Sequence, residues 1–299
     1  MNPAVIEVRS LTKVYGRNVA VDALDFDVAA GSVTGFLGPN GAGKTTTLRA
    51  ILGLIRPDAG ETRVFGAPYE RLGATVRRVG ALIDGQGFHP ARTARAHLRV
   101  LTAMAGLAAA RIDEVLDLVD LSDAADRRVG TFSLGMRQRL GLAGALIGEP
   151  DVLVLDEPAN GLDPAGISWM RSFLRSYADD GRTAFVSSHV LSEMTNLVDE
   201  VIVVRRGKLV VHAPTRTLIQ GDQVLANSPE PARLAQALER KGATIESQEN
   251  GGLRIGGLSV DEVGDVARTE GITLHELTRT TQTLEDVFLQ LTEGEDCDA

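Results

Sequence analysis

A glycine-rich segment near the start of the chain constrains the fold more than any other feature. Residues 33–47 read VTGFLGPNGAGKTTT, which predicts a short apolar strand, a tight turn and the first turn of a helix. The spacing G-x-x-x-x-G-K-[ST] of a phosphate-binding loop is met by Gly38, Gly43, Lys44 and Thr45. Glycines here let the backbone take positive φ and approach a ligand, so that successive N–H groups can point at phosphate oxygens.

The charges of this loop favour a nucleoside triphosphate bound together with Mg²⁺. The positive end of the helix reinforces the N–H groups, and Lys44 adds a point charge for the β and γ phosphates. The Thr45 hydroxyl can ligate Mg²⁺. Because the motif lies between a predicted strand and a predicted helix, we prefer this interpretation to a glycine-rich connection without a ligand. The predicted contacts with the nucleotide come from Gly38, Pro39, Asn40, Gly41, Ala42, Gly43, Lys44, Thr45 and Thr46.

Length and charge narrow the class of protein. A chain of 299 residues predicts one large domain and one smaller one. The net charge of -9 argues against a nucleic-acid partner, because such binders normally carry a basic face. The single cysteine, Cys297, excludes an intrachain disulfide and suits a reducing compartment.

No segment of the sequence resembles a membrane span or a signal peptide. The N-terminus MNPAVIEVRS lacks the apolar core of a signal peptide. The longest apolar run, residues 140–148, is far shorter than the roughly 20 residues that span a bilayer. We therefore expect a chain that is cytosolic by itself and reaches a membrane only through a partner.

The residues around the phosphate loop predict a mixed sheet. Alternating apolar residues over 4–31 indicate an antiparallel flank. Tyr15, in a turn of this flank, could stack on an adenine ring, although a lone aromatic residue at such a position more often belongs to a strand or to the core. Residues 46–55 predict a helix, 60–69 a strand with a turn, and 76–84 another strand.

A helical insert is expected at about residues 86–148. Residues 94–110 and 112–121 are rich in alanine and leucine with helical periodicity. Within the insert, Ser133 can cap a helix that begins near Leu134, and the glycine that follows leaves an N–H group uncovered. This helix start is either a second anion site or an ordinary cap.

Two carboxylates end the apolar run DVLVLDEP at residues 151–158, a pattern typical of a buried parallel strand. Because adjacent residues on a strand point to opposite faces, Asp156 and Glu157 must have different roles. Asp156 can hold Mg²⁺ beside Thr45, and Glu157 can then polarise an attacking water. Two acids at the end of a buried strand are costly without a cation or a proton, so a purely structural role is the weaker alternative.

The next segments complete the predicted sheet. A turn at 160–163 precedes a predicted helix at about 165–178. The strand at 182–189 then places His189 at its carboxyl end, where α/β sheets bind their ligands. A hairpin follows at 201–211.

The composition changes after about residue 215, where no further phosphate-type loop occurs. The elements predicted there are strand 223–227, helix 230–241, strands 243–248 and 252–256, helix 259–270, strand 272–278 and helix 283–292. The order βαββαβ with an added helix indicates a small ferredoxin-like α+β domain without a visible catalytic group. We therefore divide the chain into residues 4–215 and an accessory domain at 216–299.

Taken together and in this order, these elements resemble the ATP-binding cassette of ABC transporters over residues 4–215. The features of that family are an adenine-stacking aromatic residue, a phosphate loop, a signature sequence in a helical insert, an acid-ended strand, a D-loop and a switch histidine. They are matched here by Tyr15, GPNGAGKT at 38–45, FSLGM at 132–136, VLVLDE at 152–157, NGLD at 160–163 and His189.

The resemblance implies an α/β P-loop NTPase fold and an ATPase that uses ATP and Mg²⁺. Lys44, Glu157 and His189 would then be catalytic. Outside the phosphate loop, the nucleotide would be bound by Tyr15, Ser133, Gly135 and Asp163.

Two positions depart from the family pattern. The signature is usually LSGGQ, whereas this chain keeps Ser133 and Gly135 but has Met136 in place of the polar last residue. The family usually has Gln or Glu at the position of Asp84, to touch Mg²⁺ and the attacking water. Either the shorter Asp84 acts through an extra water, which is our prediction, or Gln86 takes over after a loop shift. The predicted metal-binding set is Thr45, Asp84 and Asp156.

Several segments look like the antibiotic- and multidrug-exporter branch, among them ALIDGQGFHPARTARAHL, NGLDPAGI and TLEDVFLQLT. Cassettes of that branch pair with a separately encoded polytopic membrane permease subunit. The resemblance therefore implies a peripheral position at the cytoplasmic face of the cell membrane and a head-to-tail homodimer of cassettes that closes on two MgATP. Residues 87–90 and the helical insert would receive the membrane subunit.

Two other functions stay open. A soluble ABC ATPase acting on ribosomes or DNA is disfavoured by the single cassette and the acidic balance. A regulator that binds ATP without hydrolysing it is disfavoured by Asp156, Glu157 and His189, although the altered signature and Asp84 leave room for it.

Overall fold

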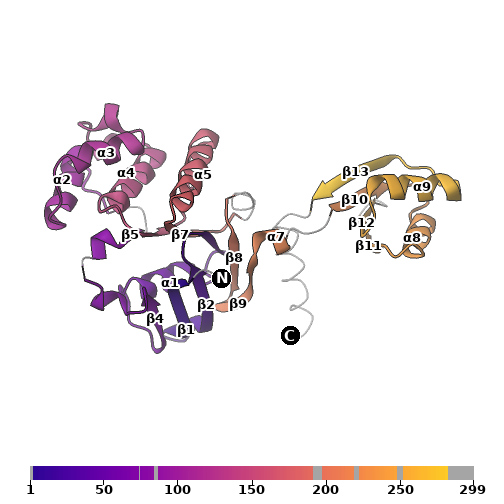
Figure 1. Cartoon of the computed structure of the whole chain (residues 1–299), viewed down its shortest axis with the longest axis horizontal. Coiled ribbons are helices and arrows are strands. Elements are labelled where there is room, and N and C mark those ends of the chain that lie inside the picture. The colour runs from indigo at the N-terminus through magenta and orange to yellow at the C-terminus, as the bar shows by residue number, and fades with distance from the viewer. Residues whose placement is uncertain are drawn as a thin grey trace. The chain divides into compact units, whose positions relative to one another are not determined.

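The computed structural model describes residues 3–73, 75–83, 87–190, 197–218, 222–247 and 252–281. The chain forms two compact units, Met1–Thr215 and Arg216–Ala299, and each is described by itself (Figure 1). No helix within the described ranges is both long and apolar enough to cross a membrane.

A six-stranded sheet forms the centre of the first unit. Its strand order is β5-β6-β7-β3-β8-β9. The strands are β3 (Val33–Leu37), β5 (Val79–Leu82), β6 (Val152–Asp156), β7 (Thr183–Ser188), β8 (Glu200–Arg205) and β9 (Lys208–Pro214). All neighbours are parallel except the β8–β9 hairpin, which is the hairpin expected at 201–211. Every residue of β3 and β7 is buried, as is usual for a parallel sheet covered on both faces.

A three-stranded antiparallel sheet of order β2-β1-β4 lies beside the first helix of this unit. Its strands are β1 (Ala4–Tyr15), β2 (Asn18–Ala29) and β4 (Ala59–Val64), and the helix is α1 (Lys44–Ile51). The two sheets share a core in which the rings of Phe26, Phe36 and Phe185 lie with centroids 5.2 to 5.7 Å apart. The antiparallel flank predicted for residues 4–31 is therefore present.

The insert that follows β5 contains, in its described residues, the α-helices α2 (Ala94–Met104), α3 (Arg111–Leu118) and α4 (Leu134–Leu146). The helix predicted at 94–110 is too long, because Gly106 takes a left-handed φ of 63° and ends α2. Similarly, α1 ends before residue 55 because Gly53 has a φ of 65°. The other helices in the described part of this unit are α5 (Pro164–Asp179) and the short 3₁₀ turns η1 (Tyr69–Arg71), η2 (Thr75–Arg77), η3 (Ser122–Ala124) and η4 (Val129–Thr131). Helix α7 (Thr215–Leu218) begins at the last residue of the unit.

In its described residues, the second unit is a four-stranded antiparallel sheet with two helices packed against it. Along the chain its elements are β10 (Asp222–Asn227), α8 (Pro231–Glu239), β11 (Thr244–Ser247), β12 (Gly252–Gly256), α9 (Val260–Glu270) and β13 (Glu276–Thr281). The strand order is β11-β12-β10-β13. Apolar residues of both helices, such as Leu234 and Val263, share a buried cluster with Val224 of the sheet.

One predicted strand of this unit is displaced along the chain. The strand expected at 272–278 begins only at Glu276, because its partner β10 ends at Asn227, directly opposite Glu276. Earlier residues have no β10 residue to pair with. The helix predicted at 283–292 lies outside the described residues.

Candidate nucleotide site

The phosphate loop joins β3 to α1 and is pressed against two neighbouring strands. Gly43 has a left-handed φ of 100°, and a Cβ placed there would lie 2.3 Å from the carbonyl oxygen of Ala20. A Cβ on Gly38 would lie 2.2 Å from the carbonyl oxygen of Val204. Both positions therefore require glycine because the backbone lies too close to a neighbouring strand for any side chain. This requirement adds to the need for positive φ that the motif implies.

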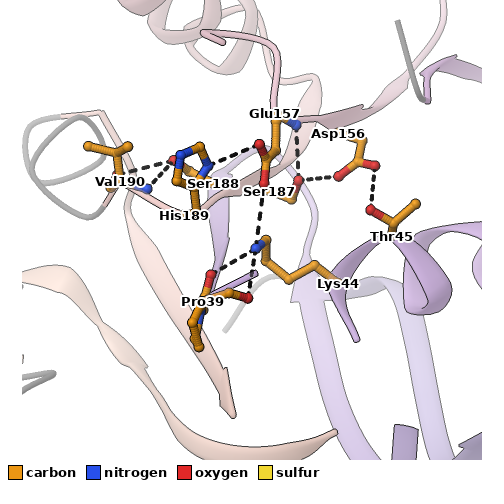
Figure 2. A network of polar contacts seen from close by, with 10 residues as sticks. Pro39, Lys44, Thr45, Asp156, Glu157, Ser187, Ser188, His189 and Val190 are labelled. Carbon is orange, nitrogen blue, oxygen red and sulfur yellow. Dashed lines mark hydrogen bonds and ion pairs between the residues drawn. The ribbon is translucent and has the colours of Figure 1, made fainter. Parts of the chain in front are cut away.

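Lys44 is the buried cation of the loop, with only 5% of its surface exposed. Its Nζ donates to the carbonyl oxygens of Gly38 at 2.7 Å and Pro39 at 3.3 Å. The same Nζ lies 3.5 Å from Oε1 of Glu157 (Figure 2). A buried ammonium needs such partners, so the loop and Glu157 are electrostatically linked through Lys44.

Thr45 and Asp156 meet at the end of β6, as the sequence predicted. The Thr45 hydroxyl donates to Oδ2 of Asp156 at 2.7 Å. A hydroxyl and a carboxylate are the hard oxygen donors that Mg²⁺ prefers. Within the described ranges, no group of three or more His, Cys, Asp or Glu side chains could hold a metal ion by itself. The donor set thus fits an ion that completes its coordination with phosphate oxygens and water, as Mg²⁺ does at nucleotide sites.

Glu157 and His189 form the other end of the same network. His189 Nδ1 lies 2.9 Å from Oε2 of Glu157. Glu157 has a left-handed φ of 48°, an unusual conformation for a residue with a Cβ. The chain therefore turns sharply after Asp156, and this turn carries the second carboxylate toward Lys44 and His189 (Figure 2).

The signature residues lie at the start of α4. The Ser133 hydroxyl accepts a hydrogen bond from the N–H of Met136 at 3.2 Å, so the predicted cap is present. Asp163 caps α5 in the same way through the N–H of Gly166 at 2.8 Å. Ser133, Gly135 and Asp163 all line one cavity of about 640 Å³.

The turn at residues 160–163 connects this cavity with a second one. Glu157 and His189 line a second, smaller cavity of about 120 Å³. Gly161 and Leu162 line both cavities. Ser133 on one side, and Glu157 and His189 on the other, therefore line neighbouring cavities that share this short turn.

Tyr15 lies at the end of β1 and is 47% exposed, which leaves its ring accessible. Nζ of Lys13 lies 5.5 Å from the centre of that ring, within the range of a cation–π contact. Asp84 and Gln86, between which the metal contact was left open, both lie outside the described residues.

The sequence motifs did not predict that Ser187 belongs to this network. Ser187 hydrogen-bonds both Asp156 and the backbone of Glu157, although no motif singled it out. Its position two residues before His189 was the available signal. His97 lies in the helical insert, and its pKa is lowered chiefly by burial.

Comparison with known proteins identifies the family. A family model described as ABC transporter matches residues 21–160. The bacitracin transport ATP-binding protein BcrA of Bacillus licheniformis is 45% identical over 213 residues, covering 70% of each chain. The Nod factor export ATP-binding protein I of Burkholderia orbicola is 36% identical over 301 residues, covering 98% of each chain. The chain belongs to the ABC transporter family of ATP-binding subunits and is a member of the ABC ATPases.

Solved structures agree with this assignment at the level of the fold. A solved ATP-binding subunit of an ABC transporter superposes with a TM-score of 0.65 at 25% identity, covering 72% of this chain and 91% of that one. The cassette fold expected for the first unit is thereby confirmed. A second family model, described only as a domain of unknown function, matches residues 222–285.

Proposed function

We propose that this ABC ATPase drives export of an antibiotic, a drug or a similar amphipathic compound through a separately encoded membrane permease. Relatives named for bacitracin transport and Nod factor export support an exporter. The observation that carries the ATPase part is the continuous network from the phosphate loop through Lys44 and Glu157 to His189 (Figure 2). The chain would then act as a peripheral subunit at the cytoplasmic face of the membrane.

The loop and Lys44 bind the β and γ phosphates of ATP in this proposal, through backbone N–H groups and the ammonium charge. Thr45 and Asp156 would hold Mg²⁺, with Asp84 as the proposed third contact. When bound, the ion would supply positive charge that neutralises the charge developing on the phosphate oxygens. Tyr15 stacks on the adenine ring.

Glu157 acts as the general base. The oxygen of a water attacks the γ phosphorus, and the bond from that phosphorus to the β–γ bridging oxygen breaks, so that ADP leaves. Glu157 takes the water proton, and His189, 2.9 Å away, orients the carboxylate. Lys44 moves from its pairing with Glu157 toward the phosphates, which frees the carboxylate for the water.

A second copy of the cassette completes each site. Ser133 and Gly135 lie at a helix start whose cavity is open to solvent, and an anion is stabilised at such a position. In a head-to-tail pair, this helix start faces the γ phosphate held by the partner, and Asp163 lies at the contact between copies. Hydrolysis divides the negative charge of ATP between ADP and phosphate, which repel each other, and the pair of cassettes opens. The permease, which docks on residues 87–90 and the helical insert, moves with the cassettes.

The replacement Glu157→Gln tests this mechanism. It keeps the size of the side chain but removes the base, so we expect ATP binding to stay intact while hydrolysis falls by at least about 100-fold. The variant should accumulate as an ATP-bound dimer in size-exclusion chromatography with MgATP. As a matched control, Lys44→Ala should lose both binding and dimer formation. An active, monomeric Glu157→Gln variant would contradict the proposal.

Co-purification tests the exporter part separately. The tagged chain is expressed in its native cells, the membranes are gently solubilised, and bound proteins are identified. A polytopic membrane protein in near one-to-one ratio is the expected result. Recovery alone, or with ribosomal proteins, would overturn the exporter assignment while leaving the ATPase intact.

A further inference from the structure

Ser187 is a buried residue whose side chain contacts both Asp156 and Glu157 and has no role in the mechanism above. It lies near the carboxyl end of β7 and is 0% exposed. Its hydroxyl donates to Oδ1 of Asp156 at 2.5 Å and accepts the N–H of Glu157 at 3.0 Å (Figure 2). A hydroxyl is suited to this position because it donates and accepts at once.

The sheet itself places this hydroxyl. Ser187 pairs with Asp156 across the parallel β6–β7 ladder, and on the other side with Phe36 of β3. β7 therefore separates the strand that carries the acids from the strand that leads into the phosphate loop. No loop motion is needed to bring Ser187 to the acids.

The contact with Asp156 restrains the carboxylate from a second side. Oδ2 accepts from Thr45 at 2.7 Å, and Oδ1 accepts from Ser187. A carboxylate held at both oxygens has a defined plane. Hydrogen bonds of this kind orient metal-holding groups and change their affinity for the ion.

The contact with Glu157 restrains the backbone. Glu157 holds a left-handed φ of 48°, which costs free energy and persists only where the surroundings impose it. Its N–H is fixed by Ser187, so the turn that aims the carboxylate at Lys44 and His189 is anchored to β7.

We propose that Ser187 is a positioning residue that sets the orientation of Asp156 and Glu157 relative to each other. The proposal rests on the ATPase mechanism given above. In this role Ser187 acts through its hydrogen bonds to the two acids. Loss of its hydroxyl impairs both the hold on the metal and the step that uses the general base.

Ser187→Ala tests this role with two readouts. Using Mn²⁺ as the probe ion, the concentration needed for half-maximal ATPase activity should rise by about 10- to 100-fold, and kcat should fall over a similar range. Mn²⁺ binding in the presence of ATP, measured by electron paramagnetic resonance, should weaken in parallel. Binding of ATP without metal should be unchanged, because the hydrogen bonds of the Ser187 hydroxyl go to Asp156 and Glu157 and, among the described residues, to none of the phosphate loop. Ser187→Thr, which keeps the hydroxyl, should restore Mn²⁺ binding.

The neighbouring serine provides a matched control. Ser188 is also buried, with 5% exposure, but among the described residues its hydroxyl exchanges hydrogen bonds with the backbone of Val190, at 2.9 and 3.1 Å, and with neither acid. Ser188→Ala should keep the wild-type metal dependence. Equal effects of the two replacements, or wild-type values for Ser187→Ala, would overturn the proposal.

Failure of the ATPase proposal would look different. Wild-type protein would then hydrolyse no ATP, whereas Mn²⁺ binding by Ser187→Ala and by the wild type could still be compared. If Ser187→Ala does not fold, Ser187→Cys replaces it in the same measurements, since a thiol is close in size but only a weak donor.

Discussion

The identity of two residues in the phosphate loop is fixed by steric exclusion from neighbouring strands as well as by the chemistry of the ligand. The loop passes so close to the Ala20 and Val204 carbonyl oxygens that no side chain fits at Gly43 or Gly38. The sequence motif shows which positions are glycine. Only the structure shows that neighbouring strands, β2 and β8, make two of them obligatory.

Gly43→Ala should therefore do more damage than an ordinary replacement at positive φ. The backbone strain of a left-handed alanine costs about 1–2 kcal/mol, and the Cβ would also lie 2.3 Å from a carbonyl oxygen. We expect the loop to shift and ATP affinity to fall by at least about tenfold, which is a loss of about 1.4 kcal/mol of binding free energy. Equilibrium nucleotide binding measures this directly.

The control for that replacement is Gly66→Ala. Gly66 has a φ of 74°, but a Cβ there meets nothing within 4 Å. This variant should lose stability by about 1–2 kcal/mol and bind ATP normally. Similar ATP affinities for both variants would show that the collision at Gly43 is relieved at no cost.

Among the elements, α4 combines a structural and a proposed functional use of one hydroxyl. Ser133 caps the helix through the N–H of Met136, and it is also proposed to face the partner's γ phosphate. The sequence is compatible with a cap and with an anion site, and the structure shows the cap.

Two replacements of Ser133 separate these uses. Ser133→Ala should lower the free energy of unfolding by about 1 kcal/mol and reduce hydrolysis. Ser133→Asp should recover the lost stability, because aspartate caps as well as serine and its charge favours a helix start. Hydrolysis should not recover, since the added charge repels the phosphate. Urea unfolding and ATPase assays measure both effects, and an active Ser133→Asp variant would limit Ser133 to capping.

Elements with strong patterns were predictable from the sequence, whereas their ends and side contacts were not. Continuous apolar runs in the sequence predict the buried strands β3, β6 and β7. A serine before an apolar segment predicts the cap of α4. The end of α2 at Met104 depends on a single glycine at 106, and the start of β13 depends on where its partner strand ends. Ser187 escaped prediction because its importance comes from the register between β6 and β7, which spacing along the chain does not reveal.

At the scale of the whole molecule, the two units have separate cores. The buried apolar cluster of the second unit is drawn from residues 224–272, and the large cluster around β1 and β3 from residues 5–204. Each cluster is closed within its own unit, which favours independent folding.

A chain shortened to residues 1–218 should accordingly keep the nucleotide site. This piece contains every described strand and helix of the first unit and the start of the connection at α7. We expect it to bind ATP within about threefold of the full chain, a difference of less than about 0.7 kcal/mol. Isothermal calorimetry of both chains compares the affinities, with circular dichroism to establish folding. Loss of ATP binding in a folded 1–218 chain would show that the second unit contributes to the site.

The position of β7 between β6 and β3 also determines when the site can form during synthesis. The phosphate loop leaves the ribosome about 150 residues before Ser187 and His189. At a translation rate of roughly 5–20 residues per second, about 7–30 s pass between synthesis of the loop and synthesis of β7, the strand next to β3. We expect β3 to lack its neighbour β7 throughout that interval, so the nucleotide site is incomplete while the chain is being synthesised. ATP should therefore have little effect on the early stages of synthesis. In the finished protein, where the site is complete, ATP should slow unfolding.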